Sequence, residues 1–258
     1  MAPATLALAA LFAAVIGLTL GMIGGGGSIL TVPVFVYVLG LPAKQAIAMS
    51  LPVVGATSLV GAAGHWRVGN VQWRTALGFG LVAMAGSFGG ARLAHLLDGA
   101  VQLTLLGAVM LGAAVSMLRS RDEAVPPREG APRRIALVAG AGLGVGVMTG
   151  LVGIGGGFLI VPALVLLVGL PMKRAVGTSL VVITMNAASG FAGYAGTTTI
   201  DWRGMGVFTA LAIAGVLAGT RLAAHVPARQ LKRLFAIFLV AIATFVLYQN
   251  RGVFLGTR

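Results

Sequence analysis

The second half of the chain repeats the first half at a constant offset of 129 residues. The stretch GMIGGGGSILTVP at 21–33 returns as GLVGIGGGFLIVP at 150–162, and GLPAK at 40–44 returns as GLPMK at 169–173. Single residues coincide as well, among them Trp73 with Trp202. Many matches at one fixed spacing indicate a fused duplication, so the two halves should share one fold.

Each half contains five apolar segments, which in the first half lie at about 4–23, 29–40, 45–65, 75–97 and 101–118. With 58% hydrophobic and 9% charged residues, the chain has too little polar surface for a soluble globule. The apolar runs are continuous, which favours membrane helices over a β-barrel. The second segment is shorter than the ~20 residues that cross a bilayer. We therefore expect an all-α integral membrane protein with about 8 spanning helices and two short broken half-helices.

A charged, proline-rich stretch, RSRDEAVPPREGAPRR at 119–134, separates the halves. It predicts a first membrane repeat at 1–118, a linker at 119–134 and a second membrane repeat at 135–258. The number of crossings decides whether the repeats are parallel or inverted, because inversion requires the short segment to reverse the chain.

The basic residues favour inverted halves. Five passes per half leave only 5 of the 18 basic residues on one side, namely Lys44, Arg92, Arg203, Arg251 and Arg258. Four passes per half would divide the 18 residues into 8 and 10, without a bias. Since positive loops stay in the cytoplasm, we expect a cytoplasmic linker and both termini outside. Orientation also explains the net charge of +13, so no nucleic-acid partner is expected.

The glycine runs break the apolar pattern in both halves. Residues 24–32 are expected to be irregular, because glycine is flexible and Pro33 opposes a straight continuation of the first helix. A short helix after each run would direct free N–H groups at an anion, and inverted halves would bring both runs to the midplane. This hypothesis assigns substrate binding to the residues of the runs, namely Gly24, Gly25, Gly26, Gly27, Ser28, Gly153, Gly155, Gly156 and Gly157. The alternative is that these glycines only allow close helix packing, which we expect for Gly86, Gly90, Gly215 and Gly219.

Several polar residues interrupt the apolar segments near the runs. The candidates for hydrogen bonds to an anionic oxygen are Ser50, Thr57, Thr178, Ser179, Thr184 and Asn186. Each hydroxyl has the alternative of bonding its own helix backbone. A role in substrate binding is favoured for Ser179, because it coincides with Ser50 in the repeat. It is also favoured for Asn186, because burying an amide without a hydrogen-bond partner costs free energy.

Charged residues within the segments are few. Lys44, Lys173, Arg92 and Arg221 lie near segment ends, where we expect interfacial anchors, although the lysines also suit the attraction of anions. His65, His95 and His225 lie near segment ends too. All five acidic residues fall in or beside loops, so any proton coupling would need the anion itself or a histidine. No pattern of nucleophile and base or of metal ligands is present, so we expect no enzymatic activity and no cofactor.

The doubled GxGGG-x-L-x-VP motif, the following G-L-P-x-K and Gly177-Thr178-Ser179 resemble the TauE/SafE family of sulfite exporter-like membrane proteins. The resemblance covers nearly the whole chain. It implies a permease of the bacterial cytoplasmic (inner) membrane that moves sulfite, sulfonates or related oxyanions, most often outward. The first half departs from the pattern with Ala48-Met49-Ser50 and with Ser28 at the position of Gly157, so the halves need not contribute equally.

Two other functions stay open at this point: a membrane anchor or assembly component without transport, and a passive anion channel. Broken helices and paired polar residues favour transport over an anchor, which needs neither. The expected partners are a small anionic substrate and the lipid bilayer, and a homo-oligomer is an open alternative. The anion, the direction and the driving force are not fixed by the sequence.

Overall fold

The computed structural model describes residues 3–119, 132–152, 157–194 and 200–251. Within these ranges every regular element is helical, as the apolar segments predict. Most of the predicted linker at 119–134, namely residues 120–131, lies outside these ranges.

The helices of the first half follow the predicted segments closely. They are α1 (Pro3–Ile23), α2 (Gly26–Pro33) with its π-helical continuation η1 (Val34–Val38), α3 (Ala43–Arg67), α4 (Trp73–Leu93) with the 3-10 turn η2 (Ala94–Leu96), and α5 (Gly99–Arg119). The second half repeats this order with α6 (Pro132–Val152), α7 (Gly157–Leu166), α8 (Met172–Tyr194), α9 (Trp202–Ala223) and α10 (Ala228–Gln249). Each half therefore contains one short helix directly after its glycine run.

Six helices of the described residues are long and apolar enough to cross a membrane: α3, α4 with η2, α5, α8, α9 and α10. Helices α1 and α6 have 21 residues each, but their apolar described parts, Leu8–Ile23 and Val138–Val152, are shorter. The chain is thus an all-helical membrane protein, and the number of about 8 spans stays a prediction.

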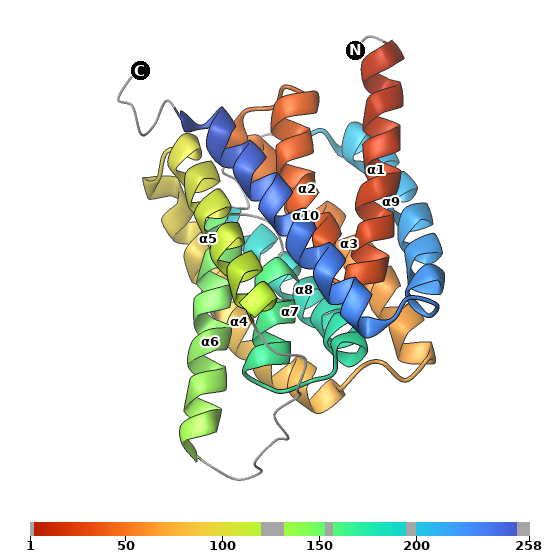
Figure 1. Cartoon of the computed structure of the whole chain (residues 1–258). Coiled ribbons are helices and arrows are strands. Elements are labelled where there is room, and N and C mark those ends of the chain that lie inside the picture. Colours follow the sequence, from red (N-terminus) through yellow and green to blue (C-terminus); the bar gives the residue numbers. More distant parts are fainter. Residues whose placement is uncertain (1–2, 120–131, 153–156, 195–199, 252–258) are drawn as a thin grey trace.

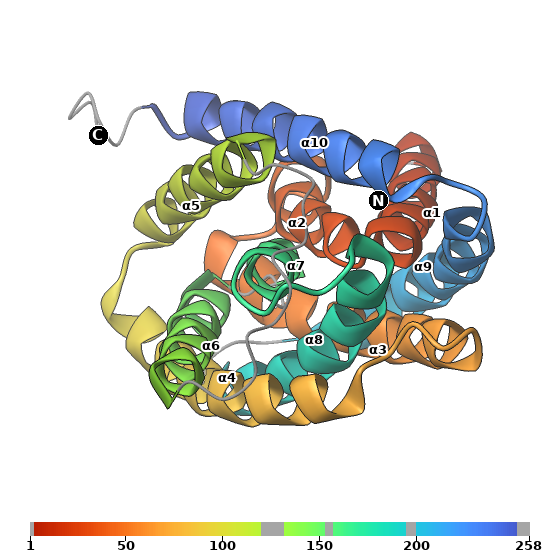
Figure 2. The same cartoon turned by 60° about the horizontal axis from the view of Figure 1, so that its bottom comes forward.

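The two halves are interleaved in the bundle. Helix α1 packs along α9 of the other half, and its repeat counterpart α6 packs along α4. Helices α3 and α8 pack against each other, and so do α5 and α10. Figure 2 shows the short helices α2 and α7 near the centre of the bundle, enclosed by the long ones. Neither half forms a separate body, because its main helix contacts are with the other half.

Small residues form the seams of the two interleaved pairs. A Cβ atom added to Gly86 or Gly90 of α4 would collide with the backbone of α6 at Leu143 or Val147. The repeat-related Gly215 and Gly219 of α9 approach the backbone of α1 in the same way. The prediction that these four glycines serve helix packing is confirmed.

The expectation of an irregular segment at 24–32 is wrong. Only Gly24, with a φ of +76°, and Gly25 interrupt the helix, and α2 begins at Gly26. Helical backbone persists because apolar surroundings require internal hydrogen bonds. Gly27 lies against Ile16 and Leu20 of α1, where no side chain fits.

Pro33 does not end the short helix either. The N–H of Val34 bonds to the carbonyls of Leu30 and Thr31, and the chain continues as the wider turns of η1 until Leu39. The short helix thus contains its proline, and the π-helical turns follow directly after it.

Candidate functional site

The start of α7 in the second half meets the helix break of the first half, at Gly24 and Gly25, inside the bundle. Helix α7 begins at Gly157, and a Cβ atom there would lie 2.7 Å from the Cα of Gly25 and 3.2 Å from the carbonyl oxygen of Gly24. Only glycine allows this approach. Gly153, Gly155 and Gly156 lie outside the described residues, so the contact rests on Gly157 and the first break.

Helix α8 closes one side of this contact with Ser179 and Ile183. A Cβ atom on Gly24 would lie 2.8 Å from the Ser179 Oγ, and one on Gly157 would lie 2.6 Å from the Ile183 Cδ1. The two side chains are four residues apart and therefore share one face of α8. Asn186 continues the same face, three residues beyond Ile183.

The Asn186 side chain is fully buried, and neither its Oδ1 nor its Nδ2 has a hydrogen-bond partner among the described residues. Desolvating an amide without a partner costs ~1–3 kcal/mol. Because nearly all buried polar groups in proteins are hydrogen-bonded, this amide is a candidate for contact with a ligand oxygen or a water molecule.

The hydroxyl groups of the predicted site already donate to backbone carbonyls. The Ser28 Oγ donates to Gly25 over 2.8 Å, and the Ser50 and Ser179 Oγ atoms donate over 2.7 Å to Ile47 and Val176. Thr57 likewise bonds carbonyls of its own helix.

Thr178 instead accepts a 3.0 Å hydrogen bond from the N–H of Gln72, directly before α4. It therefore fixes the start of α4. In this conformation Asn186 has no hydrogen-bond partner among the described residues, and the substrate-binding role of the whole set stays a prediction.

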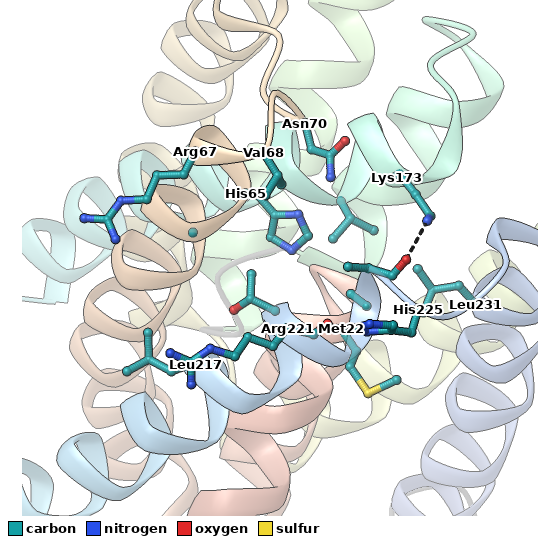
Figure 3. Close-up of a pocket in the computed structure, with 15 residues that line it drawn as sticks. Met22, His65, Arg67, Val68, Asn70, Lys173, Leu217, Arg221, His225 and Leu231 are labelled. Carbon is teal, nitrogen blue, oxygen red and sulfur yellow. Dashed lines mark hydrogen bonds between the residues drawn. The ribbon is translucent and has the colours of Figure 1, made fainter.

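A cavity of about 460 Å³ opens next to the break at one end of the bundle. It lies where α3 ends, α8 begins and α9 ends, and its inner wall includes Met22 and Val176. Val176 touches the break, since a Cβ atom on Gly24 would lie 2.9 Å from its Cα. The cavity, hereafter the vestibule, is thus separated from the break at Gly24 by the side of α8 that carries Val176. Figure 3 shows its lining side chains.

The vestibule is lined by cationic residues. Arg67, Lys173 and Arg221 contribute positive charge, His65 and His225 contribute imidazoles, and no carboxylate is among its described lining residues. The Lys173 Nζ donates to the carbonyl of Ala224 over 3.2 Å, across the rim in Figure 3. Low-dielectric walls with charge of one sign concentrate ions of the opposite sign, here anions.

Sequence reasoning placed these basic residues singly at segment ends and did not group them. They come from both halves and from helices that are far apart in the chain, so no local motif marks them. The only available signal was the charge count, which assigned Arg67, Lys173 and Arg221 to the same side of the membrane.

The sulfite exporter TauE/SafE family model matches residues 9–246 of the chain. A probable membrane transporter protein of Xylella fastidiosa strain 9a5c is 34% identical over 240 residues, which cover 91% of this chain and 92% of the relative. The probable membrane transporter protein YdhB of Bacillus subtilis is 28% identical, with 83% and 85% covered. A third relative, the probable membrane transporter protein MJ0441 of Methanocaldococcus jannaschii, is 29% identical over 187 residues, 70% and 68% of the two chains. No solved structure matches the chain.

Proposed function

Because the chain belongs to the sulfite exporter TauE/SafE family and is a membrane transporter, we propose that it exports small sulfur-containing anions such as sulfite or sulfonates. The observation that carries the proposal is the vestibule of Arg67, Lys173 and Arg221, whose lining residue Val176 touches Gly24 at the contact with Gly157. A volume of about 460 Å³ lies within the usual range of ligand pockets and accommodates a small oxyanion with part of its hydration shell.

The binding site proper lies between the first break, at Gly24 and Gly25, and the start of α7 at Gly157. The N-terminal end of α2 and the Asn186 amide supply hydrogen-bond donors, while the Ser179 hydroxyl already donates to Val176 and contributes shape. Anions are favoured at a helix N-terminus by about 0.3–1 kcal/mol, and by up to about 2 kcal/mol where the site is partly buried. That modest energy suits a carrier, which has to release its substrate.

Inverted halves give such a site access from both faces. The repeat-related helices α3 and α8 support this arrangement, because the last turn of α3 at His65 lies beside the first turns of α8 at Gly177. The two helices therefore run antiparallel. The start of α1 and the end of α10 lie at the upper end of the molecule in Figure 1, opposite to the vestibule.

The charge distribution orients the molecule. The vestibule residues Arg67, Lys173 and Arg221 belong to the larger group of basic residues, which favours the cytoplasmic side of a bacterial inner membrane. The conformation described here is then open toward the cytoplasm, as an exporter needs for loading. Alternating access would next close the vestibule and open its repeat counterpart near Lys44 and Arg92.

Reconstituted vesicles test the proposal. Purified protein in proteoliposomes should exchange radiolabelled sulfite or methanesulfonate against the same unlabelled anion, but not against chloride. Exchange in the absence of net flux identifies a carrier and contradicts a channel. Lys173→Gln and Arg221→Gln should lower the rate, whereas Arg74→Gln, an exposed arginine that does not line the vestibule, should not. Equal rates in all three variants, or no anion exchange by the wild type, would refute the proposal.

A further inference from the structure

The two halves use different side chains, His65 and Tyr194, to contact equivalent backbone carbonyls. The His65 Nε2 lies 2.9 Å from the carbonyl oxygen of Gly21, in the last turn of α1. In the second half, Tyr194 occupies the position of His65 and its hydroxyl lies 3.2 Å from the carbonyl oxygen of Gly150, which corresponds to Gly21. Both side chains thus contact equivalent carbonyls near the ends of α1 and α6. In the first half the helix break leaves the Gly21 carbonyl without its usual partner, the N–H of Gly25. The two side chains differ in that only the imidazole can bind a proton near neutral pH.

The second nitrogen of His65 is not engaged. A carbonyl only accepts, so Nε2 carries hydrogen, and Nδ1 is left as the site for a second proton. Nδ1 is buried and has no partner among the described residues. His65 itself is 3% exposed and belongs to the lining of the vestibule, near the middle of the cluster in Figure 3.

The surroundings of His65 decide when that proton binds. The charged and titratable groups around the vestibule are Arg67 on its own helix, Lys173 on α8, Arg221 on α9 and His225 after α9. The described stretch of α1 that packs against it contributes no charged side chain. All these groups are basic, so an imidazolium in the empty vestibule is opposed by its neighbours. An anion in the vestibule offsets that repulsion and gives an Nδ1–H group an acceptor.

We propose that His65 is the proton-binding residue of the transporter and takes up a proton when an anion occupies the cytoplasmic vestibule. This inference rests on the proposed anion transport. The proton and the anion stabilise each other, so a monoanion would load together with one proton, without net charge. Tyr194 does not titrate in this range, so the coupling belongs to one face only. In this way a chain whose described membrane helices lack carboxylates acquires a proton site.

Binding calorimetry on the full chain in lipid nanodiscs tests the inference, with methanesulfonate as the probe because its charge is constant across the relevant pH range. Titrations in two buffers of different ionisation enthalpy count the protons taken up per anion. The wild type should take up as much as about one proton per anion at pH values where His65 is neutral in the empty vestibule and protonated in the anion complex. In that pH range the affinity should fall as the pH rises, by at most tenfold per pH unit, because each bound anion needs a proton that becomes scarcer.

His65→Tyr copies the side chain that the second half uses for the same carbonyl, so it should bind the anion without proton uptake and without this pH dependence. His65→Gln retains an amide donor for Gly21 and serves if the tyrosine variant does not fold. His95→Gln, an exposed histidine outside the vestibule, should behave as the wild type. His225→Gln tests the rival imidazole of the vestibule.

The outcomes separate the two proposals. Anion binding without proton uptake in the wild type, unchanged uptake in both His65 variants, or loss of uptake only in His225→Gln overturns the role of His65 and leaves the anion vestibule in place. If the wild type binds neither methanesulfonate nor sulfate, the vestibule is no anion site, and both proposals fail.

Discussion

At the residue scale, the site combines positions that a sequence reveals with positions that it hides. The glycine runs and Asn186 were identifiable because consecutive glycines and a lone amide are unusual in apolar segments. The hydrogen-bond partners of the hydroxyls were not identifiable, because the same local sequence allows a helical serine to bond either its own backbone or a substrate. Only the three-dimensional structure shows that Ser28 and Ser50 donate to carbonyls while Asn186 is left without a partner among the described residues.

Asn186→Leu should separate stability from function. Leucine has a similar volume and removes a buried amide without a partner, so the variant should be more stable by about 1–3 kcal/mol. It should also lose most of the thermal stabilisation by anions, because the donors for the substrate are gone. Melting temperatures with and without methanesulfonate measure both effects. Ser58→Ala removes another buried polar group without a partner among the described residues and should leave the anion effect intact. A less stable Asn186→Leu protein would show that the amide has a structural partner.

Gly157→Ala tests the contact between the start of α7 and the first break. The added Cβ atom would lie 2.7 Å from the Gly25 Cα, so either α7 or the segment at Gly25 has to shift. Overpacking typically costs ~1–3 kcal/mol, and 1.4 kcal/mol is tenfold in an equilibrium constant. We expect transport per folded molecule to fall by about tenfold or more on this scale. The control is Gly112→Ala in α5, where a Cβ atom meets no neighbour within 4 Å. Equal transport by both variants would exclude the contact from the site.

At the element scale, helix positions were predictable to within a few residues, because long apolar segments bounded by Gly, Pro and charged residues leave few alternatives. The short helices were harder. Helix α2 begins at Gly26, where Gly27 packs against the backbone of α1, and its chain continues past Pro33 into the π-helical turns of η1. Tertiary contacts here outweigh the low helix propensity of glycine and proline.

Two adjacent glycines of α4 provide a matched test of the seams. Gly90→Val places a side chain against the backbone of α6 at Val147, whereas a Cβ atom on Gly89 meets nothing within 4 Å. Both changes introduce the same β-branched residue into the same turn of one helix. Gly90→Val should therefore lower the yield of folded protein strongly and Gly89→Val only slightly. Size-exclusion chromatography of detergent-solubilised protein measures the folded fraction. Similar losses in both variants would indicate helix propensity, and not the seam, as the cause.

At the scale of the whole molecule, the duplication and the membrane class followed from the sequence. Which helices pack against each other could not be predicted from it. A repeat at an offset of 129 residues states that the halves are alike but not how they dock, and the pairing of α1 with α9 joins segments almost 200 residues apart. The vestibule has the same origin, since its basic residues meet only after the halves have docked.

Cysteine labelling of repeat-equivalent positions tests the inverted arrangement. The chain contains no cysteine, and Leu96 in the first half corresponds to the exposed His225 in the second. Inverted halves place equivalent residues on opposite faces. In spheroplasts a membrane-impermeant maleimide should therefore label Leu96→Cys and spare His225→Cys until the membrane is opened. Labelling of both cysteines from outside, or of neither, would instead indicate parallel halves.

The interleaving of the halves also imposes a schedule on biosynthesis. Helix α4 meets its partner α6 soon after leaving the ribosome, but α1 ends at Ile23 and its partner α9 begins only at Trp202. At a synthesis rate of ~5–20 residues per second, α1 spends roughly 10–40 seconds in lipid before α9 packs against it. An unpaired helix is stable there because its backbone hydrogen bonds are internal. The carbonyl of Gly21, where that internal pattern fails, is satisfied much earlier, as soon as α3 delivers His65.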